Sequence, residues 1–170
     1  MKNTPLDWIK EASEPARSYR KMVIGWQNSA IVLNSTVLLF NSEFLKKEEE
    51  REHDTHQLMR EIAVKKLVIS ALFELKPQLD AWYRRLSDDG LLTEKTIEKK
   101  KEVRHLLDQV KKFEGIRNSA FHFGDVNEET EALLSIYDEI YGIDLALLNQ
   151  ILKEMMSLGY MLRDHASVKT

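Results

Sequence analysis

Three residues in the second half of the chain, Arg117, Asn118 and His122, carry groups that suit phosphate chemistry. Arg provides a permanent planar cation that matches phosphate oxygens, and the imidazole of His titrates near neutral pH. On a helix, Asn118 and His122 share one face, so the Asn amide can orient the imidazole. Arg117 lies about 140° around the helix from His122 and reaches the same point only through its long side chain. One copy of the motif therefore supplies half of a site.

A purely structural role is compatible with the same residues. An Arg/His pair at a helix end, with Phe121 and Phe123 packed in the core, would produce the same pattern. The two interpretations differ in the charge that they require of the residues before the motif. A catalytic motif for a polyanion needs cations nearby, whereas a structural motif does not.

The stretch that leads into the motif, residues 95–117, is locally basic. It holds eight Lys or Arg and four acids, although the whole chain has a net charge of −3. RNA is one such polyanion. We predict that Arg104, Lys111 and Lys112 would contact its backbone, because Lys and Arg bind phosphates electrostatically. The alternative is a solvated helix face of mixed charge, which is a common arrangement. The acidic balance of the whole chain does not favour general polyanion binding.

The composition indicates which elements position the motif. The chain has 170 residues, 43% of them hydrophobic and 31% charged, with three Pro and six Gly. This is typical of one globular domain, residues 1–170, built from long helices. Without cysteine there is no disulfide, thiolate metal site or Cys nucleophile, and a cytoplasmic location is expected. The most apolar run, residues 22–40, contains several polar residues, so no membrane span is expected.

Apolar spacing and helix-start residues predict an all-α fold, an up-and-down bundle of four to five main helices with long first and second helices. A leading turn is expected at 5–9, with Thr4 as N-cap and Pro5 in the first helical position. The predicted helices cover residues 15–47, 55–82, 94–113, 128–141 and 144–165. Pro77 should kink the second helix or break it. The Ser-Asp-Asp-Gly sequence at 87–90 is the clearest turn.

Two Glu-x-x-His pairs, Glu50/His53 and Glu102/His105, invite comparison with di-metal carboxylate bundles. That chemistry needs such a pair from each of two helices and an inward-facing Glu from each of two others. Glu50/His53 lies in the most polar part of the chain, and no inward-facing Glu stands out in the first or last helix. We therefore predict no metal ligands and no cofactor, and keep the di-metal bundle as the lesser alternative.

The motif Arg117-Asn118-x-x-x-His122, on a helix of a small all-α chain, resembles the R-x(4–6)-H signature of the HEPN superfamily. The resemblance implies an α-helical, commonly dimeric protein and a metal-independent endoribonuclease. It implies catalytic roles for Arg117, Asn118 and His122, and a homodimer in which two motifs face each other. RNA cleavage would leave a 2′,3′-cyclic phosphate. A toxin or an antiviral defence effector is the implied biology, with an antitoxin or a nucleotidyltransferase as a further partner.

The alternative from another class is a non-catalytic HEPN-like module that binds RNA or a protein, in which the motif serves structure. The net acidic charge favours this alternative over a free-standing nuclease. The two differ in one measurable property, the cleavage of RNA in the presence of a chelator.

Overall fold

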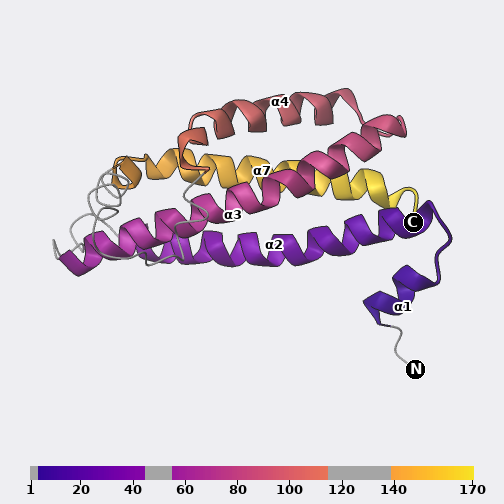
Figure 1. Cartoon of the computed structure of the whole chain (residues 1–170), viewed down its shortest axis with the longest axis horizontal. Helices are drawn as coiled ribbons and strands as arrows, with labels where there is room; N and C mark the ends of the chain where they lie inside the picture. The colour runs from indigo at the N-terminus through magenta and orange to yellow at the C-terminus, as the bar shows by residue number, and fades with distance from the viewer. Residues whose placement is uncertain (1–3, 45–54, 115–138) are drawn as a thin grey trace, which may run out of the picture.

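The computed structural model describes residues 4–44, 55–114 and 139–170, and every regular element within these ranges is helical. The elements are α1 (Pro5–Lys10), α2 (Ala16–Phe44), α3 (Thr55–Asp88), α4 (Glu94–Asp108), the 3₁₀ turn η2 (Lys111–Phe113) and α7 (Leu145–Ser167). In Figure 1 the four long helices run lengthwise and alternate in direction, and α1 projects from one end. The predicted all-α up-and-down bundle, with long first and second helices, is confirmed.

Helix starts follow local capping chemistry. Thr4 and Asp7 form a reciprocal capping box: the Thr4 hydroxyl accepts from the Asp7 backbone at 3.2 Å, and the Asp7 carboxylate accepts from the Thr4 backbone at 2.9 Å. Hydrogen bonds from Thr4 hold the pKa of Asp7 below its usual value. Thr93 caps α4, and Asp144 caps α7 by accepting from a backbone N–H at 2.9 Å. The cap predicted at Thr4 is confirmed.

The second long helix excludes one of the two outcomes expected at Pro77, a break. α3 continues through Pro77, so the break that this proline permits does not occur. The residue is exposed, while Phe73, Leu75 and Leu79 around it are buried. Packing of this buried face maintains the helix where proline removes one backbone hydrogen bond. The chain turns instead at Gly90, whose φ of 66° lies in the left-handed region that favours glycine.

The core is built around α7, which packs against α2, α3 and α4. Seven of its side chains are fully buried: Leu148, Ile151, Leu152, Met155, Leu158, Leu162 and Ala166. Opposite them on α2, Trp26 is also fully buried, and its ring meets that of Tyr160 edge to face at 5.3 Å. A Cβ atom at Gly159 would lie 2.1 Å from the Trp26 ring. Glycine therefore allows α7 to approach α2 this closely.

A charged side chain also lies in the interior. Lys65 of α3 is 2% exposed and donates to the carboxylate of Glu61 at 2.7 Å and to the backbone carbonyl of Tyr141 at 2.6 Å. Burial of an ammonium group is costly unless partners replace its water, and these two acceptors do so. Lys65 thus fixes the residues before α7 against α3.

Among the helices of the described ranges, none has both the length and the apolar character to cross a membrane.

Candidate functional site

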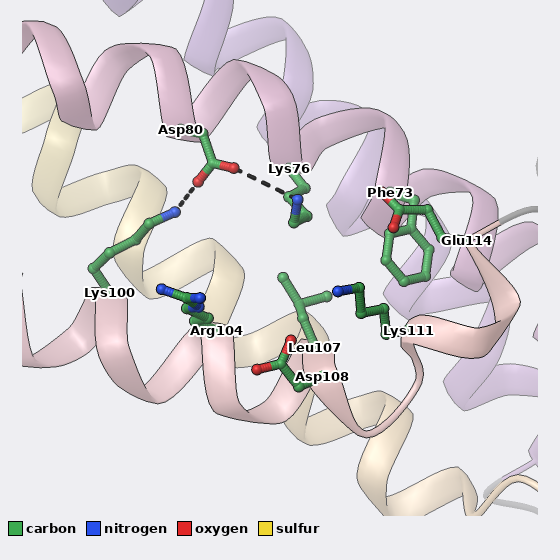
Figure 2. A pocket seen from close by; sticks show the side chains of 9 residues that line it. All are labelled: Phe73, Lys76, Asp80, Lys100, Arg104, Leu107, Asp108, Lys111 and Glu114. Carbon is green, nitrogen blue, oxygen red and sulfur yellow. Dashed lines mark hydrogen bonds and ion pairs between the residues drawn. The ribbon is translucent and has the colours of Figure 1, made fainter.

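A charged pocket opens between α3 and α4, with a volume of about 270 Å³ (Figure 2). Two apolar residues line it, Phe73 from α3 and Leu107 from α4, and both are buried. The other lining side chains are four cations and three acids: Lys76, Lys100, Arg104, Lys111, Asp80, Asp108 and Glu114. We call this the α3–α4 pocket. It combines two buried apolar side chains with seven charged ones, and apolar pockets with a few polar groups hold ligands in a fixed orientation.

The charges in the α3–α4 pocket fall into two groups. The carboxylate of Asp80 pairs with the ammonium of Lys100 across the two helices and with that of Lys76 at 3.7 Å on its own helix. By contrast, Arg104 and Lys111 form no ion pair or hydrogen bond with any residue in the described ranges. An anion can therefore bind this guanidinium and this ammonium group without displacing a carboxylate of the described residues.

The acids also fall into a paired and an unpaired group among the described residues, and Asp80 is the paired one. Asp108 and Glu114 line the pocket, are exposed, and have no partner among the described residues. An ionised carboxylate only accepts hydrogen bonds, so these two groups are available to N–H donors of a ligand. Arg104, Asp108 and Lys111 are separated by four and three residues, which places them on one side of the chain as α4 ends.

The basic stretch predicted from the sequence does not act as one surface. Arg104 and Lys111 lie together in the pocket, as does Lys100, which the prediction did not single out. Lys112 lies elsewhere: its ammonium group donates to the carboxylate of Glu139 at 2.9 Å. Two of the three predicted RNA-contacting residues are thus brought together, and the third is engaged in a surface ion pair.

Lys99 and its neighbour Lys100 contact different helices. Its ammonium group donates to Glu102 at 2.6 Å and to Glu154 of α7 at 2.5 Å, so it links α4 to α7 and does not face the pocket. These hydrogen bonds, that to Glu102 first, raise the pKa of Lys99 above its usual value. Lys99 and Lys100 are adjacent in sequence and point to different helices because successive helical residues are about 100° apart.

The predicted catalytic residues Arg117, Asn118 and His122 lie outside the described residues, as does the Glu50/His53 pair. Glu102 and His105 are both on α4 and exposed. Within the described ranges, no group of three or more His, Asp or Glu side chains is placed to hold a metal ion.

Sequence reasoning missed the α3 side of the pocket, Lys76 and Asp80, and the acids Asp108 and Glu114. One signal was available: Lys100, Arg104 and Lys111 recur at intervals of four and seven residues, which is the spacing of one helical face. Nothing in the sequence indicated which face of α3 lies opposite.

Searches against protein-family models, curated proteins and solved structures found no match for this chain.

Proposed function

We propose that this chain is a metal-independent endoribonuclease of the HEPN type that acts in the cytoplasm. The observation that carries the proposal is the sequence Arg117-Asn118-x-x-x-His122 in a chain whose described residues form an all-α bundle. The α3–α4 pocket supports it, because its cations Arg104 and Lys111, which have no partner among the described residues, are suited to RNA phosphates. Glu114, which lines the pocket, precedes Arg117 by only three residues in the sequence.

The proposed reaction is an internal transfer at phosphorus. The 2′-oxygen of a ribose forms a bond to the adjacent phosphorus, and the bond from phosphorus to the 5′-oxygen of the next nucleotide breaks. The products carry a 2′,3′-cyclic phosphate and a 5′-hydroxyl. His122 accepts the proton of the 2′-hydroxyl, since its ordinary pKa lies near 6.5. Arg117 stabilises the extra negative charge on the phosphoryl oxygens, and Asn118 orients His122 or contacts RNA.

A second acid completes the proton balance, because the 5′-oxygen must receive a proton as it leaves. One imidazole that has just accepted a proton from the 2′-hydroxyl lies on the wrong side of the phosphorus to do this in the same step. We propose that a symmetric homodimer supplies the His122 of the second copy as that acid. An antitoxin or a nucleotidyltransferase that binds this dimer would regulate a toxin or antiviral defence effector.

The test is incubation of the purified chain with RNA in excess chelator, followed by identification of the product ends. Wild type should leave 2′,3′-cyclic phosphate ends, and His122→Ala should reduce the rate by about 10²–10⁴-fold, the usual contribution of a general acid or base. His105→Ala is the matched control, because His105 is an exposed residue of α4. Absence of cleavage by wild type, or equal cleavage by His122→Ala, would refute the proposal.

The dimer is tested separately by light scattering at the concentration of the activity assay. A dimer that cleaves RNA supports the shared site. A monomer that retains full activity contradicts it, because one copy would then supply both proton transfers.

A non-catalytic interaction module is the second candidate, and an apolar groove between α2 and α3 favours it. The groove has a volume of about 210 Å³ and includes Val32, Leu33 and Leu75 in its lining. Val32 is 59% exposed, and Ile31 beside it in sequence is 65% exposed. Exposed apolar side chains beside a groove are typical of protein-binding surfaces. RNA that is bound but not cleaved, together with a monomer that recruits a protein through this groove, would favour this candidate over the nuclease.

A further inference from the structure

We propose that the α3–α4 pocket binds a guanosine monophosphate unit, with the phosphate at Arg104 and Lys111 and the base edge at Asp108 or Glu114. This inference rests on the proposed function for the choice of a ribonucleotide over other ligands of mixed polarity. The unit can be a free nucleotide or one nucleotide of an RNA chain, since the recognised groups are the same.

Two of the four cations that line the pocket are suited to a phosphate. Asp80 already neutralises part of the charge of Lys76 and Lys100, whereas Arg104 and Lys111 have no described partner. In Figure 2 the Lys111 ammonium group points toward the middle of the pocket. A guanidinium group binds phosphate oxygens through two parallel hydrogen bonds, and an adjacent ammonium adds a point charge.

The two acids Asp108 and Glu114 argue against a simple phosphate site. Asp108 and Glu114 would repel an anion and reduce the affinity for inorganic phosphate. Neither carboxylate pairs with Arg104 or Lys111, although all four groups line the same pocket. The pocket therefore presents separate anion-binding and donor-binding groups. A ligand that satisfies both must carry a negative charge as well as N–H donors.

Among the RNA bases, guanine fits a carboxylate best. Its Watson–Crick edge has two adjacent N–H donor groups, at N1 and N2, which match the two oxygens of one carboxylate. Adenine and cytosine offer one amino group on that edge, and uracil offers one imino group. The buried apolar side chains of Phe73 and Leu107 also line the pocket, and apolar surface of this kind strengthens nearby hydrogen bonds by reducing contact with water.

Size also limits the ligand. Ligand-binding pockets commonly measure about 300–1,000 Å³, and the α3–α4 pocket, at about 270 Å³, lies just below that range. It is suited to one nucleotide and not to a stacked series. Flanking nucleotides of an RNA chain would extend beyond the pocket rim.

The experiment is calorimetric titration of the full chain with GMP, AMP, UMP and inorganic phosphate at low salt. GMP should bind at least about fivefold more tightly than AMP or UMP, the smallest effect expected of a two-bond base contact. Arg104→Gln should weaken binding of all three nucleotides, with the exposed Arg84→Gln as matched control. Asp108→Asn or Glu114→Gln should abolish the preference for GMP but not nucleotide binding, with the exposed Glu98→Gln as matched control.

Two further arms identify the source of the nucleotide. A 2′-O-methyl oligouridine, which lacks the attacking hydroxyl, is compared with the same oligomer carrying one guanosine. Tighter binding of the guanosine-containing oligomer than of GMP supports a site that recognises RNA, and the reverse order supports a site for free GMP. Equal binding of GMP, AMP and UMP, or binding of inorganic phosphate as tight as that of GMP, overturns the inference.

The outcome is separable from that of the ribonuclease proposal. Chelator-resistant cleavage without any preference for GMP would overturn the guanosine site and leave the nuclease intact. A preference for GMP that disappears in Asp108→Asn or Glu114→Gln, without RNA cleavage, would support the site and refute the nuclease.

Discussion

Replacement of Gly159 by Ala tests the close approach of α7 to α2. An added Cβ would lie 2.1 Å from one carbon atom of the Trp26 ring and 2.2 Å from a second. Carbon atoms pack best at about 3.5–4.0 Å, so the helix or the ring must move by more than an ångström. Trp26 is fully buried and packs against the Tyr160 ring, so it has no free space to enter.

The expected magnitude comes from two opposing effects. Overpacking of a well-packed core costs about 1–3 kcal/mol and occasionally more, and the deep overlap here places Gly159→Ala at the upper end. Ala gains about 1 kcal/mol over Gly in a helix interior. We therefore expect the free energy of unfolding to fall by about 2 kcal/mol. For a urea dependence of about 2 kcal/mol per molar, this lowers the unfolding midpoint by roughly 1 M.

Gly25 offers a matched control on α2. A Cβ there would lie 3.0 Å from the Trp82 ring and 3.2 Å from the side-chain nitrogen of Gln78. Both neighbours are only partly buried and can yield by a few tenths of an ångström. Gly25→Ala should therefore be neutral, or stabilise by up to about 1 kcal/mol through helix propensity.

The assay is urea unfolding followed by circular dichroism. Steric overlap also requires that Gly159→Ala cost much less in a Trp26→Leu background, where the ring is absent. Equal stability of Gly159→Ala and wild type, or an equal loss for Gly25→Ala, would show that the packing argument is wrong. An undiminished cost of Gly159→Ala in the Trp26→Leu background would show the same.

Two further predictions concern buried polar groups. Lys65→Met should lower the free energy of unfolding by about 2–4 kcal/mol, because it leaves the Glu61 carboxylate and the Tyr141 carbonyl without their buried donor. Urea unfolding measures this loss, and an unchanged free energy of unfolding would contradict the prediction. Burial, followed by the hydrogen bond to Asp89, raises the pKa of Tyr19 above 10.0. Because the unfolded tyrosine ionises first, this contribution to stability is complete below about pH 10 and is lost as the pH rises through the folded pKa. Tyr19→Phe should remove this part of the alkaline decline in urea midpoint, and an unchanged decline would refute the assignment.

Much of the fold could be predicted because its signals are local. The start of α1 follows from Thr4 and Pro5, the start of α4 from Thr93, and the turn from Gly90. These features depend on residues within a few positions of one another. Pro77 shows the limit of such reasoning, because the buried residues on either side of it maintain α3 through packing that the local sequence does not reveal.

The pocket could be predicted only in part for the same reason. Arg104 and Lys111 were identified because a run of cations is visible in the sequence. Asp80 was missed because its pairing with Lys100 spans 20 residues and depends on which faces of α3 and α4 are opposed. Lys112 was grouped with Lys111 by adjacency, although a helical turn sends neighbouring side chains in different directions. The roles of Arg117, Asn118 and His122 stay predictions.

The contacts on either side of residues 115–138 bear on the entropy of closing the chain at this point. Lys112 contacts Glu139 at 2.9 Å, and Lys65 binds the Tyr141 carbonyl at 2.6 Å, so the helical bundle itself brings the two ends of this segment together. The entropy of closing a chain between fixed ends grows only with the logarithm of its length, by about 0.6 kcal/mol for each doubling. The contacts of Lys112 with Glu139 and of Lys65 with Tyr141 therefore offset part of this closure entropy, whatever conformation residues 115–138 adopt.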